Sequence, residues 1–197
     1  MKKSVLIPIL TLILCGALLF GATMVTYPQY LENYHGWHLQ DMKTLLPGSE
    51  NFVVEPYSGE DANILSVHRG ETGYVIETQT YGYAGNITML IAVSTEGKVV
   101  GLVVRDQSET LGLGAKALRD HEFLAQFLNG SGTFAVGAPG ADAFSGATGE
   151  AATGEETYVD AITGATVTSK AIARSVSSAV AYVTGADVAS TATTWGG

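Results

Sequence analysis

The chain has almost no cysteine. A single thiol, Cys15, stands among 197 residues and lies within the most apolar stretch. One thiol cannot form a disulfide within the chain, a CxxC pair, a thiolate-held iron–sulfur cluster or a c-type haem attachment. Any redox role of this chain therefore depends on a cofactor that other side chains hold.

Charged residues are the second shortage. They make up only 15% of the chain, and 19 acidic residues outnumber 10 basic ones, which gives a formal net charge of −9. Because a phosphate backbone requires a basic face, this balance excludes nucleic acid as a partner. Apolar residues make up 46% of the chain, so the composition is that of a folded protein, since disorder requires low hydrophobicity.

The N-terminal region contains a long run without charge. Residues 4–31 contain no charged side chain, and the apolar part extends from Val5 to Val25. About 20 helical residues span a bilayer core, so residues 4–26 predict a single transmembrane anchor in the cell membrane. Lys2 and Lys3 precede it and acidic residues follow it, so residues 1–3 are expected in the cytoplasm and the remaining chain outside. A cleaved signal peptide is the alternative, although no A-x-A site follows the apolar run.

Residues 27–39 predict an interfacial segment beside the membrane. Tyrosine and tryptophan residues of the kind found at membrane interfaces gather there: Tyr27, Tyr30, Tyr34 and Trp37. His35 and His38, with Glu32 and Asp41 nearby, could hold a metal ion. Histidines among interfacial aromatic residues need no metal, however, and we predict no metal site.

Residues 40–184 predict one extracytoplasmic domain of the α+β class, with a mainly antiparallel sheet packed by helices, followed by a tail at 185–197. A short helix is expected before Pro47, since the residue before a proline disfavours helix. Apolar and β-branched residues predict strands over residues 64–68, 74–81, 86–94 and 98–105. Gly97 marks a tight turn, which predicts that the last two strands form a hairpin.

The second half of this domain alternates between helix and glycine-rich sequence. Asp120 is placed to cap a short helix, and a longer helix is expected over residues 167–183, ended by Gly185. Residues 129–159 hold seven glycines, four acidic residues and no basic one. This composition predicts a long loop, and long loops in compact domains are often functional or mobile.

The segment before the last predicted helix carries the most informative motif. It reads Asp160-Ala-Ile-Thr163-Gly164-Ala165-Thr166. Gly164 and Ala165 leave the backbone uncrowded, and Thr166 presents a hydroxyl at a helix N-terminus, where free N–H groups and the helix dipole favour a phosphate. The alternative is that Thr166 simply caps the helix.

This pattern, D-x-x-[ST]-G-A-T followed by -x-T-S, resembles the flavinylation motif of FMN-binding domains. That family includes the G subunit of the Rnf complex and the C subunit of the sodium-pumping NADH:quinone reductase. The resemblance implies that a flavin transferase moves FMN from FAD onto Thr166 as a phosphoester. It also implies that the other motif residues recognise the transferase or border the cofactor: Asp160, Thr163, Gly164, Ala165 and Thr168.

A second segment extends the resemblance. Residues 82–85, the predicted hairpin and the run Glu109-Thr110-Leu111-Gly112-Leu113-Gly114 are similar to the rest of the family's domain. The resemblance implies that Thr110, Leu111 and Leu113 lie near the flavin ring or ribityl chain. The family usually has proline where this chain has Leu111, and proline would stiffen the turn.

Two other patterns compete with this interpretation. Residues 142–148 also satisfy D-x-x-[ST]-G-A-T, which leaves Thr148 as an alternative or additional acceptor. No Ser or Thr follows two residues later, and Gly149 discourages a helix start. Residues 112–117 fit the dinucleotide fingerprint G-x-G-x-x-A, but residues 105–111 separate them from the preceding strand, and no acidic residue occurs over 129–141.

The resemblance thus implies an electron-transfer subunit with covalent FMN in a membrane ferredoxin:NAD oxidoreductase that translocates ions. Its expected partners are the other membrane and peripheral subunits, and the flavin transferase during maturation. No catalytic residue and no independent turnover are expected. A C-type subunit of the sodium-pumping quinone reductase and a flavin-free anchored binding protein remain as alternatives.

Overall fold

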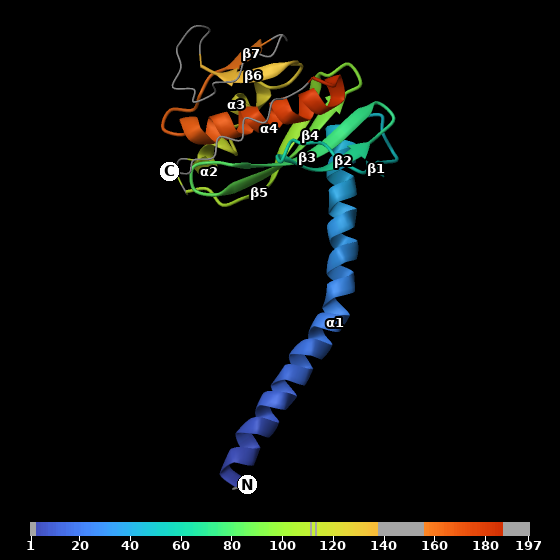
Figure 1. Cartoon of the computed structure of the whole chain (residues 1–197), viewed down its shortest axis with the longest axis vertical. Coiled ribbons are helices and arrows are strands. Elements are labelled where there is room, and N and C mark those ends of the chain that lie inside the picture. Colours follow the sequence, from blue (N-terminus) through green and yellow to red (C-terminus); the bar gives the residue numbers. More distant parts are fainter. Residues whose placement is uncertain (1–2, 111, 113, 138–155, 187–197) are drawn as a thin grey trace. The chain divides into compact units, whose positions relative to one another are not determined.

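The computed structural model describes residues 3–110, 112, 114–137 and 156–186 (Figure 1). The chain divides into two compact units, Met1–Asp41 and Met42–Gly197. The first unit consists of most of helix α1 (Lys3–Leu45). The second unit contains all the strands and the remaining helices.

One continuous helix, α1, covers the N-terminal region. It includes the residues for which we predicted an anchor (4–26) and an interfacial segment (27–39), and the short helix expected before Pro47 is its last part. The helix ends before Pro47 as predicted, because a proline disfavours helix in the residue before it. Among the residues that the structure describes, no helix is both long enough and apolar enough to cross a membrane. The structure therefore does not confirm the predicted anchor.

A five-stranded sheet forms the body of the second unit. Its strands are β1 (Val53–Glu55), β2 (Ile64–Arg69), β3 (Gly73–Tyr81), β4 (Asn86–Ser94) and β5 (Val99–Gln107). They lie in sequence order, and every neighbouring pair is antiparallel. This meander confirms the mainly antiparallel sheet expected from the sequence.

The hairpin of β4 and β5 follows the turn chemistry of its sequence. Gly97 has a φ of +78°, a conformation that glycine adopts without a steric penalty. The N–H of Gly97 donates to the carbonyl of Ser94 over 2.9 Å, and the N–H of Ser94 donates to the carbonyl of Lys98 over 2.8 Å. The predicted hairpin is therefore confirmed.

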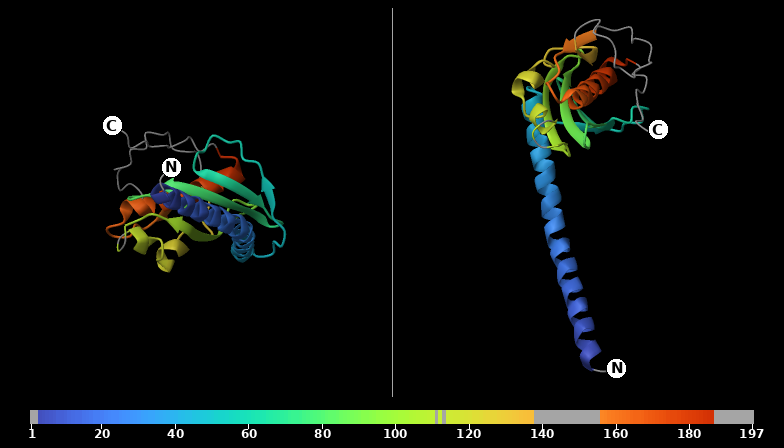
Figure 2. Two further views of the ribbon diagram at one scale, coloured as in Figure 1. Left: turned by 90° about the horizontal axis from the view of Figure 1, so that it is seen from below. Right: turned by 90° about the vertical axis from the view of Figure 1, so that its left-hand side faces the viewer.

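Helix α4 (Thr166–Thr184) lies along one face of this sheet, as Figure 2 shows. Its buried positions are mostly alanine and serine, which let the helix approach the strands closely. Thr80 on β3 donates its hydroxyl to the carbonyl of Ala171 over 3.1 Å and lies 2.9 Å from the hydroxyl of Ser175. Twelve of the 19 residues of α4 are buried.

Two clusters of apolar side chains cover the two faces of the sheet. The larger one joins α4 to sheet residues such as Ile76, Met89 and Ile91. The smaller one packs Met42 and Leu46 against the opposite face. The sheet therefore has its core on both sides, as expected for a sheet that helices pack.

The glycine-rich stretch over residues 129–159 contains two strands that the sequence did not predict. Strands β6 (Thr133–Val136) and β7 (Glu156–Val159) pair in parallel, and residues 138–155 lie outside the described residues. Phe134 and Val159 are buried in the main core, and the N–H of Phe134 donates to the hydroxyl of Ser177 on α4 over 2.9 Å. Packing against α4 therefore overrides the loop-like composition.

Two short helices connect the meander to this strand pair, α2 (Gly114–Ala117) and α3 (His121–Ala125). Asp120 caps α3 as predicted, because its Oδ1 accepts the N–H groups of Glu122 and Phe123, each over 3.1 Å. Gly185 ends α4 with a φ of +66°, which confirms the predicted stop.

Candidate functional site

The D-x-x-T-G-A-T motif folds into a turn that leads into α4. The N–H of Ala165 donates to the carbonyl of Ile162 over 2.9 Å, so residues 162–165 form a four-residue turn. Gly164, its third residue, has a φ of +81°. Turns of type II require a positive φ at this position, which favours glycine. The glycine of the motif therefore has a conformational role.

Thr166 is the first residue of α4, and its side chain is exposed. The residue at the cap position is Ala165, and no side chain caps the helix. The simpler interpretation of Thr166 as an N-cap is therefore wrong.

The start of α4 suits a phosphate ester. The first N–H groups of a helix have no acceptor within the helix, and the helix dipole places partial positive charge there. No acidic residue of α4 itself lies in its first turn. An exposed hydroxyl at this point fits the covalent attachment of a phosphate-bearing cofactor.

The two hydroxyl residues that follow point into the domain. Ser169 is buried and donates its hydroxyl to the carbonyl of Ala165 over 3.0 Å, while it accepts the N–H of Ile162 over 3.3 Å. Thr168 is also buried and donates its hydroxyl to Oε2 of Glu109 over 3.2 Å. Ser169 holds the turn and Thr168 joins α4 to Glu109. Of these three hydroxyl residues, only Thr166 is left at the surface.

The buried carboxyl group of Glu109 joins three segments that lie far apart in the sequence. Its Oε2 accepts from Thr168 on α4, and its Oε1 accepts the N–H of Ala84 over 3.3 Å. A Cβ atom on Gly82 or on Gly114 would overlap this carboxyl group. The glycines of both segments therefore leave space for Glu109, which connects them to the motif.

The segment that contains Glu109, Gly112 and Gly114, called the glycine segment below, consequently lies beside the start of α4. Figure 1 shows α2 next to the N-terminal end of that helix, and the two elements are in contact. The structure thus brings Glu109, Gly112 and Gly114 into the same region as Thr166 and Thr168.

The remaining predicted residues occupy the surface of this region or lie outside the described part. Thr110 is exposed, and its carbonyl accepts the N–H of Ala115 over 3.3 Å. Asp160 and Thr163 are exposed as well, and the N–H of Asp160 donates to Oε1 of Gln126 over 2.7 Å. Three residues of the prediction, Leu111, Leu113 and Thr148, lie outside the described residues.

The sequence interpretation missed a cavity on the same segment. It is open to solvent, has a volume of about 440 Å³ and is lined by Gly112, Ala115, Lys116, Arg119 and Asp120. Its two basic residues are three positions apart and are joined by a turn in which the N–H of Arg119 donates to the carbonyl of Lys116 over 3.1 Å. That spacing, directly after the glycine segment, is the signal that could have revealed it.

The described residues contain no group of three or more histidine, cysteine, aspartate or glutamate side chains that could hold a metal ion. The side chains of His35 and Glu32 lie outside this description.

Comparisons with known proteins agree on one family. The family model described as "FMN-binding domain" matches residues 82–181. The G subunit of an ion-translocating oxidoreductase complex from Methanosarcina acetivorans is 34% identical over 154 residues, which cover 72% of each chain. The G subunit of the proton-translocating ferredoxin:NAD(+) oxidoreductase complex of Clostridium ljungdahlii is 37% identical over 111 residues, or 56% of this chain.

The match to the Clostridium relative spans about half of that protein's length, 53%. Among solved structures, the C subunit of the Na(+)-translocating NADH-quinone reductase from Parabacteroides distasonis has 24% sequence identity and a TM-score of 0.45 over 60% of each chain.

Proposed function

Since the chain belongs to the FMN-binding domain family, we propose that it is an electron-transfer subunit that carries FMN covalently on Thr166. The observation that carries this proposal is the exposure of the Thr166 hydroxyl at the uncapped start of α4. A transferase can reach such a hydroxyl, whereas it cannot reach those of Thr168 and Ser169, which are buried.

The residues of this chain would bind and orient the cofactor. Bound FMN supplies the capacity to accept and release one or two electrons. The first N–H groups of α4 would donate to the phosphate, and the turn over residues 162–165 would fix the place of the ester. The Glu109–Thr168 hydrogen bond holds the glycine segment against the same helix. The segment containing Thr110 and Gly112 would then border the flavin, together with Leu111 and Leu113.

We further propose that the subunit acts within an Rnf-type ion-translocating ferredoxin:NAD oxidoreductase. The names of the two relatives support this assignment. A role as the C-type subunit of a sodium-pumping quinone reductase is the alternative within the family. In either complex any other redox centre on the electron path would belong to a partner subunit, because one thiol cannot hold an iron–sulfur cluster or a c-type haem.

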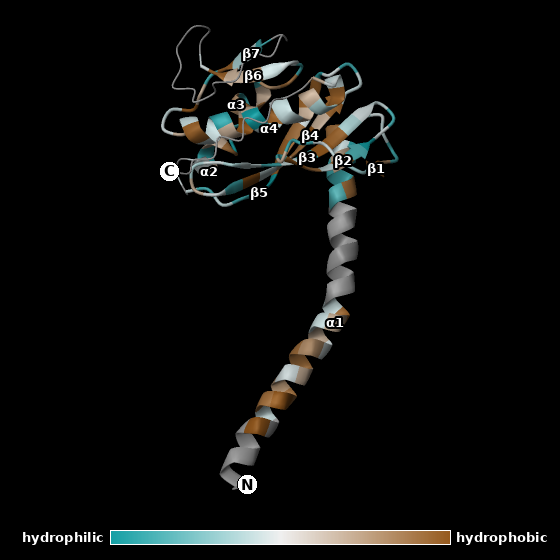
Figure 3. Cartoon of the chain, in the orientation of Figure 1, coloured by the Kyte–Doolittle hydropathy of each residue, from teal (hydrophilic) through white to brown (hydrophobic). Residues whose placement is uncertain are grey.

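The N-terminal helix would attach the subunit to the membrane. Large apolar side chains on successive positions of α1, among them Leu12, Ile13 and Leu14, are exposed, and Figure 3 shows apolar turns along this described part. Side chains on consecutive positions face different directions around a helix, so the exposed apolar surface surrounds it. With Lys2 and Lys3 in the cytoplasm, residues 40–184 form the extracytoplasmic FMN domain.

The test is the mass of the protein after co-expression with a flavin transferase. Wild type should gain one FMN phosphoester and show flavin fluorescence in a denaturing gel, and Thr166→Ala should lose both. Thr133→Ala, which changes an exposed threonine on β6, is the matched control and should keep the adduct. Persistence of the adduct in Thr166→Ala with its loss in Thr148→Ala would assign the acceptor to the second motif. Unmodified wild-type protein would instead support a flavin-free binding protein.

A further inference from the structure

The cavity beside the glycine segment is basic on an otherwise acidic chain. Its lining includes Lys116 and Arg119, whereas the whole chain has a formal net charge of −9. Both side chains are exposed. The third charged residue of the lining, Asp120, uses its Oδ1 to cap α3.

Lys116 and Arg119 differ from three other basic residues of the domain, whose charges are paired with carboxylates. Lys43, Arg69 and Lys98 each form an ion pair, with N–O distances of 2.8, 3.6 and 3.9 Å. No ion pair joins Lys116 or Arg119 to any side chain that the structure describes. The two cations outnumber the single carboxylate of the lining, that of Asp120, so the lining carries net positive charge, which favours an anionic occupant.

The cavity lies close to the proposed attachment point. Ala115 in its wall follows Gly114, where an added Cβ would lie 2.9 Å from Oγ1 of Thr168. Thr168 is two residues from Thr166, and consecutive Cα atoms are about 3.8 Å apart. A flavin attached through its phosphate and five-carbon ribityl chain can therefore reach the cavity. Its volume of about 440 Å³ falls in the range of small-molecule sites, roughly 300–1,000 Å³.

We propose that Lys116 and Arg119 face the flavin ring attached at Thr166 and raise its midpoint potential by stabilising the charge of the reduced ring. This inference rests on the proposed function. Uptake of two electrons and one proton converts the neutral oxidised ring into a reduced ring that carries one negative charge. A nearby cation favours the reduced form, since opposite charges about 4 Å apart attract even in a watery environment.

The experiment is a reductive titration of the flavinylated full chain with dithionite, which supplies the two electrons. Lys116→Met and Arg119→Met should each make reduction about fivefold less favourable, which for a two-electron couple is a fall of about 20 mV. Lys116→Arg keeps the charge and should retain the wild-type potential. Lys98→Met is the matched control, because it removes an exposed cation from the β4–β5 turn without touching the cavity.

A second readout uses sulfite, whose lone pair forms a bond to N5 of the oxidised ring and leaves negative charge on the flavin. The dissociation constant for sulfite should rise about fivefold in Lys116→Met and stay unchanged in Lys98→Met. Equal potentials in wild type and both cavity variants would overturn the inference, as would an equal fall in Lys98→Met.

Failure of this inference is distinct from failure of the proposed function. Intact mass first establishes that each variant carries one FMN. Fully flavinylated variants with unchanged potential would contradict the role of the cavity, and would leave the attachment at Thr166 standing. Retention of FMN by Thr166→Ala would contradict the proposed function itself.

Discussion

At the scale of single residues, the site depends on one carboxyl group enclosed by glycines. Glu109 is buried and accepts hydrogen bonds from Thr168 and from the backbone of Ala84. A buried acceptor that loses its donor costs about 1–3 kcal/mol, so these contacts fix the geometry of the region. The glycines at 82 and 114 supply the space that this arrangement requires.

The first prediction concerns Gly114→Ala. Its Cβ would overlap Glu109 and lie 2.9 Å from Oγ1 of Thr168, and overpacking of this kind costs roughly 1–3 kcal/mol. Urea denaturation should show that loss in the free energy of unfolding. In a Glu109→Ala background the same change should cost much less, because contacting residues are energetically coupled. Equal costs in both backgrounds would contradict the proposed packing.

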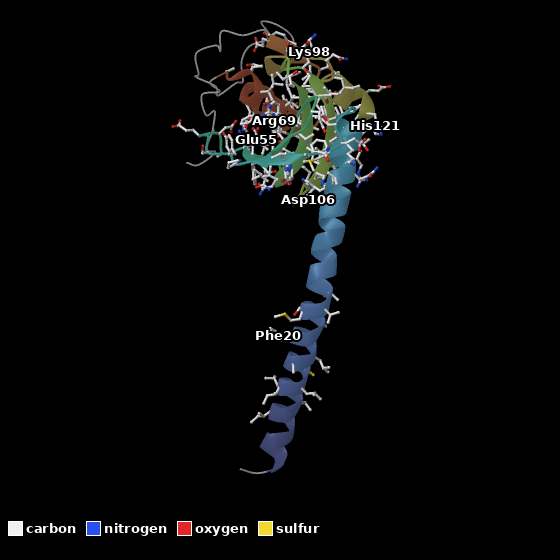
Figure 4. All side chains as sticks on the ribbon, turned by 90° about the vertical axis from the view of Figure 1, so that its right-hand side faces the viewer. Phe20, Glu55, Arg69, Lys98, Asp106 and His121 are labelled. Atoms are coloured by element: carbon white, nitrogen blue, oxygen red, sulfur yellow. The ribbon has the colours of Figure 1, made fainter. Side chains whose placement is uncertain are left out.

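At the scale of secondary-structure elements, the far end of α4 is joined to the first strand by a tyrosine. The hydroxyl of Tyr182 donates to Oε2 of Glu55 on β1 over 3.1 Å. Its ring lies edge-on to those of Tyr57 and Tyr74, at centroid distances of 5.9 and 6.0 Å. Glu55 also pairs with Arg69 over 3.6 Å, and Figure 4 shows these two side chains together.

The second prediction follows from the titration of this tyrosine. Burial, and then the hydrogen bond to Glu55, raise the pKa of Tyr182 to about 12 from an ordinary value of 10.0. Above the ordinary pKa the unfolded chain loses this proton first, so the folded state binds more protons. The stabilisation is fully present below the unfolded pKa and is lost as the pH rises from the ordinary value through about 12.

Denaturation with urea at a series of alkaline pH values measures this effect. Tyr182→Phe should flatten the decline in stability over that interval. Tyr81→Phe, at an exposed position on β3, should decline like the wild type. The explanation fails if Tyr182→Phe loses stability with pH as steeply as the unchanged chain.

How far each element can be predicted from the sequence depends on how local its signal is. The β4–β5 hairpin and the stop of α4 were predictable because Gly97 and Gly185 mark turns within a few residues. Strands β6 and β7 were not, since each has four residues and pairs across a long connection. Likewise the motif located Thr166, but its neighbour Glu109 contacts Thr168 from 59 residues away, and no local pattern shows such a contact.

At the scale of the whole molecule, the two units differ in what their surfaces expose. The first unit exposes large apolar side chains, including Leu14, Leu18 and Phe20, and Figure 4 shows Phe20 projecting from the helix. The second unit buries many of its large apolar residues in two clusters, although others, such as Val53 and Val54, are exposed. Apolar surface of this extent marks an interaction with lipid or with another apolar surface.

The third prediction concerns where the chain is found after cell lysis. The wild-type chain should sediment with membranes and remain there after an alkaline carbonate wash. Leu14→Glu combined with Leu18→Glu should release it, because acidic side chains are costly in an apolar environment. Val53→Glu combined with Val54→Glu, at two exposed positions on β1, is the matched control and should stay bound. Release of both variants, or of neither, would contradict attachment through α1.

The burial of α4 also bears on the order in which the protein matures. This helix packs against β3 and β4 and also against β6, so its native surroundings are complete only where both sheets are in place. The surface position of the Thr166 hydroxyl depends on the same packing, since the turn before it is held by the buried Ser169. Attachment of a flavin at this threonine would therefore act as a checkpoint, because only a domain that has completed its fold would display the acceptor correctly.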